Sequence, residues 1–414
     1  IFVQMQGTDD AANLEGSQGR SDAAVAQKDK QNGKFISLQT LKLLPALCLM
    51  LAGCWDRVQL ENRGFVSAFG IDAYRAEDPP VQALRIGSAG GKDRFVATVC
   101  MPDNTGKQEG GTVRLTSAAD SLMPALSLIR LGTSQEPYYG QAKAIVLGDG
   151  LLRDPELVAT AIDALERNRE IPRKVAVLAS KADAAEVLTA DIDGDQFGMY
   201  ITNFYANRPA AMGLAFKHDL ENVLRDLRDS GGTVIPLVEV RGGVVSLSSA
   251  VMLSDYKFAG TLDDSHVRGL MFARGNAKDA HITAEFEGVR VPLRISSQRA
   301  RLSFKRGGDG PVGVLRISVK GSVEEYRSTP HQDISTPQNV ARLNKLFADA
   351  IEKEVLAAYD VMREAGVDGL GMMERMRKFH YSLYEEHVKN GMSAGDIPLI
   401  TLIDVHVTDV GAIR

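Results

Sequence analysis

A short apolar run that ends in a cysteine divides this chain into two parts. Residues 43–52 are almost entirely apolar, Gly53 and Cys54 follow, and four lysines precede the run, namely Lys28, Lys30, Lys34 and Lys42. The run has about ten residues, roughly half of the ~20 that a helix needs to cross a bilayer. Basic residues, a short apolar core and then small residues are typical of a secretory signal peptide. We therefore expect the folded protein to begin after this run.

The residues Leu51, Ala52, Gly53 and Cys54 predict lipid attachment as well as export. Leu-Ala-Gly-Cys is the pattern that a bacterial lipoprotein signal peptidase recognises after the cysteine thiol has been diacylated. The small Ala52 and Gly53 let an extended backbone enter the peptidase, and the thiol of Cys54 is the nucleophile that takes the lipid. The alternative is a buried helix that happens to end in Gly-Cys. We predict a leader with a lipoprotein signal peptide over residues 1–53, of which residues 1–33 have a disordered composition.

Composition limits the class of protein that follows Cys54. About 360 of the 414 residues remain after it, which favours two or three domains. A hydrophobic fraction of 44% and a charged fraction of 24% are those of an ordinary globular protein. A formal net charge of -5 gives no reason to expect nucleic acid as a partner, because neutralising phosphates needs a basic surface.

The three cysteines predict a mature protein without an intrachain disulfide. Cys48 would be removed with the leader and Cys54 would carry lipid, which leaves Cys100 alone. Cys100 lies in the strand-like run 95–100, so we interpret it as a small buried apolar residue and not as a reactive thiol.

Residues 55–245 have the pattern of an α/β region, which could divide into two domains near residue 195. Strands are expected at 64–72 and 94–101, and we predict an antiparallel pair because no crossover helix is visible between them. Next come an amphipathic helix at 117–130, a strand at 143–147 and a helix from Pro155 to about Asn168, with Asp154 as its N-cap. The remaining expected elements are a strand at 174–179, a helix at 184–188, a helix at 218–229 and strands at 233–240 and 244–253.

Residues 246–414 predict a C-terminal α+β domain. Strands are expected at 289–296, 299–305, 312–320 and 399–407, with helices at 337–366 and 371–389. The first of these helices is the longest in the chain, at about 43 Å for its ~29 residues. The expected fold class is therefore multidomain α/β (α+β), with mixed sheets, packed helices and a long helix in the C-terminal domain.

The chain carries no motif that asks for catalysis, a metal or a cofactor. Asp191, Asp193 and Asp195 resemble the start of an EF-hand loop, but Gln196 and Thr202 occupy the positions of its required Gly and Glu. His380, Tyr384 and His387 would share a helix face, yet without metalloprotease spacing a polar surface is the preferred interpretation. No Gly-x-Ser-x-Gly elbow and no phosphate-binding Gly-rich loop is present. We predict a protein that is not an enzyme.

Several segments together resemble the Ger(x)C family of spore germination lipoproteins. The start of the mature chain, residues 54–62, reads Cys-Trp-Asp-Arg-Val-Gln-Leu-Glu-Asn. The other matching segments follow in the family's order: Gly70-Ile71-Asp72, Gly140-Gln141-Ala142-Lys143, Ile145-Val146-Leu147-Gly148, Arg167-Asn168-Arg169-Glu170-Ile171-Pro172, Ala184-Ala185-Glu186-Val187-Leu188, Ile235-Pro236 and Asp368-Gly369-Leu370-Gly371. The resemblance covers about residues 41–414.

The resemblance implies a subunit of a nutrient germinant receptor. It implies an α/β fold of about three domains, a lipid on Cys54, and a place on the outer face of the inner spore membrane beside a membrane-spanning A subunit and a transporter-like B subunit. It supplies no catalytic residues. A lipid-anchored solute-binding protein of an importer is the alternative, although such proteins have two similar α/β lobes. A cell-envelope hydrolase is a third, weaker hypothesis, because no nucleophilic residue has a recognisable general base. For partner contacts we expect the outer side of the long helix and the strands around 248–320.

Overall fold

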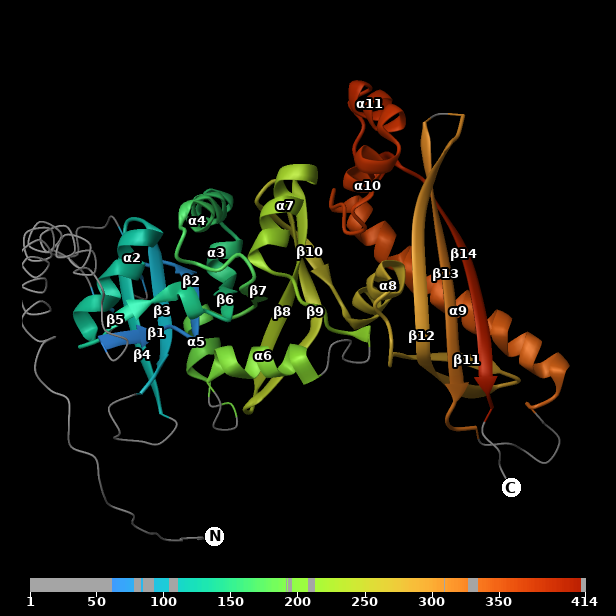
Figure 1. Ribbon diagram of the computed structural model, residues 1–414, viewed down its shortest axis with the longest axis horizontal. Coiled ribbons are helices and arrows are strands. Elements are labelled where there is room, and N and C mark those ends of the chain that lie inside the picture. Colours follow the sequence, from blue (N-terminus) through green and yellow to red (C-terminus); the bar gives the residue numbers. More distant parts are fainter. Residues whose placement is uncertain are drawn as a thin grey trace, which may run out of the picture. The chain divides into compact units, whose positions relative to one another are not determined.

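The computed structural model describes residues 62–77, 83–84, 93–103, 111–190, 192, 196–207, 213–308, 310–326 and 334–410. Their strands form an eight-stranded sheet, a four-stranded sheet and a two-stranded pair, with helices packed on the larger sheets (Figure 1). Glu61–Arg414 form one compact unit. The expected multidomain α+β fold with mixed sheets is confirmed.

The eight-stranded sheet has the strand order β10-β9-β8-β7-β6-β2-β3-β4. The strands β2, β6, β7 and β8 run parallel to one another, whereas the remaining pairs are antiparallel. In chain order they are β2 (Ala68–Ala73), β3 (Phe95–Pro102), β4 (Thr112–Ala119), β6 (Ala144–Leu147), β7 (Ala176–Ser180), β8 (Gly232–Arg241), β9 (Val244–Ser254) and β10 (Lys257–Leu262). The antiparallel pairing predicted for β2 and β3 is confirmed.

Helices cover both faces of this sheet, because successive side chains of a strand point to opposite faces. On β6, Ile145 and Leu147 enter one core, and Ala144 and Val146 enter the other. The first core is closed by α2 (Leu122–Leu128), α3 (Asp149–Leu152), α4 (Pro155–Arg167) and α7 (Leu220–Ser230). The second is closed by α5 (Ala184–Thr189) and α6 (Phe197–Asn207). Short elements beside the sheet are β1 (Arg63–Phe65), which pairs with β5 (Glu136–Tyr138), η3 (Ile129–Gly132) and η4 (Tyr139–Gln141).

Local sequence signals set several helix ends. Asp154 accepts hydrogen bonds from the amides of Glu156 (3.0 Å) and Leu157 (3.1 Å), and Pro155 occupies the first turn of α4. Gly231 ends α7 with φ of +74°, a conformation that glycine adopts without strain. Both ends were predicted from these residue types and are confirmed.

The four-stranded sheet has the order β11-β12-β13-β14 and packs one face on the long helix α9 (Pro337–Glu364). Its strands are β11 (His281–Phe286), β12 (Val289–Arg306), β13 (Pro311–Val323) and β14 (Leu399–Asp409). They pair antiparallel except for β13 and β14, which are parallel. The remaining elements are α8 (Asp264–Arg274), α10 (Met372–Phe379), α11 (Tyr381–Lys389) and η6 (Ala394–Asp396).

Packing is continuous across the domain boundary that we expected near residue 245. That position lies in β9, which pairs with β8 in the eight-stranded sheet. Ala250 and Met252 of β9 share a buried cluster with Phe347 and Ile351 of α9. The structure therefore joins the two regions through β8, β9 and β10, and the division into domains at 245 or near 195 stays a prediction.

Three predicted elements differ from those observed. Residues 117–119 belong to β4 and not to a helix, because β4 pairs with β3 along its whole length and α2 begins only at Leu122. The strands expected at 289–296 and 299–305 are one strand, β12, with a β-bulge between Ile295 and Ser297. The helix expected at 371–389 breaks at His380, whose φ of -142° is not helical.

Candidate functional site

The candidate site is a polar cavity where α7, the end of α8 and the loop before α10 meet. Its volume is about 320 Å³. The family segment Asp368-Gly369-Leu370-Gly371 forms one wall, and charged side chains of α7 and α10 form most of the rest. The cavity is therefore built from segments that lie about 150 residues apart in the chain.

Asp368 fixes the start of α10. Its carboxylate accepts hydrogen bonds from the amides of Met372 and Met373, both at 2.8 Å, and so satisfies donors that a helix N-terminus leaves free. Gly371, with φ of +65°, makes the turn into the helix. Burial raises the pKa of Asp368, and the two amide hydrogen bonds oppose that shift only in part.

Arg274 connects the end of α8 to the same loop. Its Nε and Nη2 donate hydrogen bonds of 3.0 and 2.7 Å to the carbonyl oxygen of Gly369, and its guanidinium lies 5.3 Å from the centre of the Phe216 ring. Burial lowers the pKa of Arg274, while the nearby carboxylates of Asp226 and Asp368 favour its charged form. The half-buried cation is thus held by a carbonyl oxygen and an aromatic face, with two carboxylates nearby.

His218 and Asp226 form the third part of the site. The Nε2 atom of His218 lies 3.0 Å from Oγ1 of Thr233 and 3.1 Å from Oδ2 of Asp226. Burial lowers the pKa of His218 despite the carboxylate beside it, so the imidazole is neutral near pH 7. Burial tends to raise the pKa of Asp226, but its hydrogen bond with His218 and the charges of Arg225 and Arg274 lower it. The ionised Asp226 therefore balances the cations around it.

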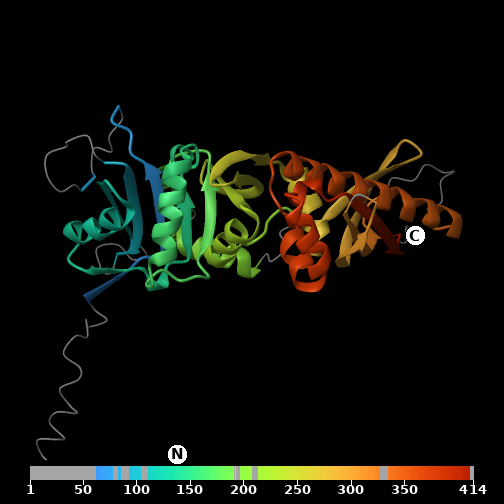
Figure 2. The ribbon, with the colours of Figure 1, turned by 90° about the horizontal axis from the view of Figure 1, so that it is seen from above.

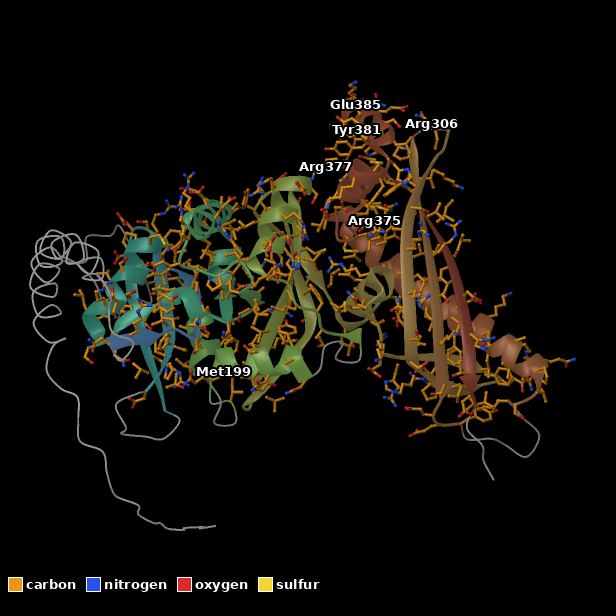
Figure 3. All side chains as sticks on the ribbon, viewed as in Figure 1. Met199, Arg306, Arg375, Arg377, Tyr381 and Glu385 are labelled. Atoms are coloured by element: carbon orange, nitrogen blue, oxygen red, sulfur yellow. The ribbon has the colours of Figure 1, made fainter. Side chains whose placement is uncertain are left out.

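Further ion pairs close the rim of the cavity. Arg225 lies 3.0 Å from Asp226 of its own helix and 3.9 Å from Glu374 of α10, and Arg377 lies 3.2 Å from Asp229. Figure 3 shows Arg375 and Arg377 on α10. These contacts tie α7 to α10 with side chains that remain partly exposed, so each contributes modestly to stability.

The chemistry of this cavity is that of charge compensation. Its described lining holds no serine, threonine or cysteine, and so supplies no hydroxyl or thiol nucleophile. Lys217, Arg225, Arg375 and Lys378 line it together with the carboxylates of Asp226 and Glu374. The arrangement suits holding α7, α8 and α10 together around a small polar space.

Three other family segments meet at the carboxyl end of β2. The carboxylate of Asp72 accepts hydrogen bonds from the amides of Ala184 (2.7 Å) and Ala185 (3.0 Å) at the start of α5. A Cβ added to Gly70 would lie 2.7 Å from Cβ of Ala184, and one added to Gly148 would lie 1.8 Å from Oδ1 of Asp72. The two glycines therefore let α5 approach the sheet closely enough for Asp72 to cap it.

The predicted attachment site lies outside the described residues. This applies to Cys54 and to Leu51, Ala52 and Gly53, and it also applies to Asp191, Asp193 and Asp195 of the acidic loop. In the part of the chain that the structure describes, no helix is long and apolar enough to cross a membrane. Lipid attachment at Cys54 stays a prediction.

His380 and His387, which we expected on one helix face with Tyr384, have different surroundings in the structure. His380 lies at the break between α10 and α11, with its ring 5.7 Å from that of Phe304. His387 is buried, and its Nε2 lies 2.7 Å from the carbonyl oxygen of Ser393. The interpretation of these residues as a polar surface is therefore wrong for His387, and the shared face stays a prediction. Among the described residues, no group of three or more His, Cys, Asp or Glu side chains is placed to hold a metal ion.

Cys100 is confirmed as a buried, free cysteine. Burial raises its pKa to about 11, against the smaller opposing effect of Arg114.

Three residues of the polar cavity were not predicted from the sequence, namely Arg274, His218 and Asp226, since none of them belongs to a recognisable motif. The segment 368–371 was the one signal that pointed to this cavity.

Comparisons with known proteins agree with this architecture. The model described as "Spore germination protein N-terminal domain" matches residues 56–240, and the model described as "Spore germination B3/ GerAC like, C-terminal" matches residues 248–411. The chain is 22% identical over 379 residues to Spore germination protein KC of Bacillus subtilis (strain 168), which covers 84% of this chain and 89% of that protein. It is 21% identical over 398 residues to Spore germination protein YndF of the same organism, covering 91% and 98% of the two chains.

A solved structure shares the fold. The crystal structure of the GerBC protein superposes with a TM-score of 0.52 at 15% identity, covering 79% of this chain and 97% of that chain. Fold and motifs together define a multidomain α+β protein of the spore germination class. The chain belongs to the Ger(x)C family of spore germination proteins, as the two family models matched along most of its length establish.

Proposed function

We propose that this chain is the lipid-anchored, non-enzymatic C subunit of a nutrient germinant receptor. The observation that carries the proposal is the match of both family models, which together extend from residue 56 to residue 411. The first match begins two residues after Cys54, where the lipoprotein signal predicts that the mature chain starts. In this proposal residues 54–61 connect the lipid to the folded unit.

The proposed mechanism is tethering. The two acyl chains on diacylated Cys54 would hold the protein stably at the outer face of the inner spore membrane. A single acyl chain would give only marginal membrane binding. Confinement to that surface raises the effective concentration of the subunit near membrane-embedded A and B subunits. The polar cavity around Arg274, where α7, α8 and the loop before α10 meet, would act as a charged junction. This charged junction would keep the body of the protein rigid while the protein contacts the A and B subunits.

The alternative of a solute-binding protein has less support. Such a protein has two similar α/β lobes with its ligand between them, whereas the two large sheets here have eight and four strands. The four-stranded sheet also differs in topology, since its long strands β12 and β13 are antiparallel neighbours. Calorimetry with candidate nutrients tests this alternative, which micromolar binding to the soluble chain would favour.

The experiment that tests the anchor replaces Cys54 with alanine. We expect Cys54→Ala to move the protein from the membrane fraction of spores to the soluble fraction and to impair nutrient germination. Cys100→Ala is the matched control, because it removes a cysteine that is buried inside the fold. The membranes are washed at high salt, which weakens contacts made by charge alone. Full retention of Cys54→Ala in the washed membranes would overturn the anchor.

A pull-down from detergent-solubilised spore membranes tests the receptor assignment. A tagged chain should recover A-type and B-type subunits, and Cys54→Ala should recover less of both because tethering is lost. Recovery of the tagged chain alone, from membranes that retain both subunits, would contradict the assignment.

A further inference from the structure

One face of the four-stranded sheet is left open by the described elements. The other face packs on α9: Thr401 contacts Glu352, and the amide of Val407 donates to Oδ1 of Asn344 at 2.9 Å. Figures 1 and 2 show α9 on one side of β12, β13 and β14. The alternate side chains of β13 and β14, such as Arg316 and Leu402, are exposed on the opposite side. We call this opposite side the outer face.

The outer face carries a group of cations on neighbouring strands. Arg301 lies directly opposite Arg316, Arg299 opposite Ser318, and Lys320 opposite Ser297. Lys305 continues the row on β12. Among the described residues none of these five cations has a carboxylate within 4.0 Å, whereas Arg294 and Arg306 at the margins of the sheet do. The members of this group, the basic face, are Arg299, Arg301, Lys305, Arg316 and Lys320.

The register of the basic face favours an external anion. Like charges directly opposite each other on neighbouring strands repel, as Arg301 and Arg316 must do in the isolated protein. An anionic group above them would relieve that repulsion. Arg299, Arg301 and Arg316 also line one open groove with Leu402 and Asp404, so the three cations border the same exposed hollow.

The extent of the basic face favours a surface over a single small ligand. From Arg299 to Lys305 the row runs about 20 Å along β12, at roughly 3.3 Å per residue. On β14, which pairs with the other side of β13, Ile400 and Leu402 are 39% and 48% exposed. Cations that spread over a sheet face next to exposed apolar groups match the phosphates and upper acyl region of a lipid layer.

We propose that the basic face rests on an anionic lipid surface. The proposal adds to the receptor role an orientation of the tethered body, with the four-stranded sheet facing the membrane. The contact with the spore membrane rests on the proposed function, because the lipid on Cys54 would bring the basic face to that membrane. The contact itself needs no acyl chain, so it can be tested without one.

The test uses residues 54–414 with Cys54→Ser, which removes both the leader and the acylation site. All three hydrophobic clusters consist of residues after 65, so this chain retains the complete core. Sedimentation with vesicles of phosphatidylglycerol and phosphatidylcholine in equal parts is compared with sedimentation with phosphatidylcholine alone. We expect binding to the anionic vesicles only, and its loss at high salt because screening shortens the range of the attraction.

The variant Arg299→Gln, Arg301→Gln, Arg316→Gln removes the central cations. At about a fivefold change for each cation near the surface, the partition coefficient should fall by roughly a hundredfold. The matched control is Arg167→Gln, Arg228→Gln, Arg241→Gln, which makes the same change in net charge at exposed positions elsewhere. Thermal unfolding of both variants checks that they fold, and the smaller pair Lys305→Gln, Lys320→Gln serves if the triple variant does not.

Retention of binding in the control and its loss in the basic-face variant would support the proposal. Equal binding by the two variants, or no binding of the parent chain to anionic vesicles, would overturn the proposal. An acidic protein would then be the partner to test for the basic face. Neither result bears on the anchor, which Cys54→Ala tests in the acylated protein.

Discussion

The guanidinium of Arg274 donates two hydrogen bonds to the carbonyl oxygen of Gly369, 95 residues further along the chain. The contact joins the end of α8 to the loop that begins α10. Both residues line the polar cavity that forms the charged junction. Arg274 is half-buried, and the nearby carboxylates of Asp226 and Asp368 favour its charged form.

We expect Arg274→Met to lower the free energy of unfolding by about 1–3 kcal/mol, because it removes two hydrogen bonds from a charged donor and leaves the carbonyl oxygen of Gly369 without them. Urea unfolding followed by circular dichroism measures the change. Arg241→Met is the control, because Arg241 pairs with Glu239 at the surface and its loss should cost less than about 1 kcal/mol. Equal effects of the two substitutions would show that the junction is not stabilised by Arg274.

Gly269 permits the close approach of α8 and α9. A Cβ added there would lie 2.1 Å from the carbonyl oxygen of Glu354, a backbone atom that cannot move alone. We expect Gly269→Ala to destabilise the protein by about 3 kcal/mol or more, because the helices must separate. Gly308→Ala is the matched control, since an added Cβ meets nothing within 4 Å. A thermal unfolding midpoint for Gly269→Ala close to that of Gly308→Ala would contradict the packing described.

Asp72 predicts a particular dependence of stability on pH. Burial raises its pKa to about 6, against the amide hydrogen bonds of Ala184 and Ala185 and starting from 3.8 in the unfolded chain. Between these values the folded state binds more protons than the unfolded state, so this contribution to stability is lost as pH rises from about 4 to 6.

The variant Asp72→Asn does not titrate and serves as the reference. Relative to it, the wild type should lose about 3 kcal/mol between pH 3 and pH 7, at about 1.4 kcal/mol for each unit of pKa shift. Urea unfolding of both chains at several pH values measures this difference, in which the other titrating groups cancel. A constant difference across the range would mean that Asp72 has no raised pKa.

Cys100 should resist thiol reagents while the protein is folded. It is buried in β3, and its raised pKa of about 11 leaves almost no thiolate at pH 8. In a chain with Cys48→Ser and Cys54→Ser, we expect labelling by iodoacetamide to be limited by unfolding and to become complete in urea. Labelling in the native state at the rate of a small free thiol would contradict this.

Elements whose signals are local were predicted well. Asp154 and Pro155 identified the start of α4, Gly231 the end of α7, and the apolar spacing of 337–366 the long helix α9. Each signal acts within a few residues, through a cap, a fixed φ or one apolar face. The sequence could therefore be interpreted correctly without knowledge of what packs against these elements.

Elements whose identity depends on distant partners were not predicted correctly from the sequence. Residues 117–119 have a helical pattern but form β4, because β3 supplies a complete hydrogen-bonding ladder. The break at His380 and the parallel pairing of β14 with β13 likewise had no local signal. Of the charged junction, only Asp368 and its neighbours were singled out in the sequence.

The sequence alone determined the predicted attachment at Cys54, the order of the family segments and the caps of individual helices, because these depend on residues that are adjacent in the chain. Only the tertiary structure decided the environment of each charge. Arg274 and Arg301 are chemically identical, yet one is half-buried and hydrogen-bonded to a carbonyl oxygen near two carboxylates, and the other is exposed opposite another arginine. The reason is physical: burial and charge compensation depend on which segments meet, and that is settled by folding of the whole chain.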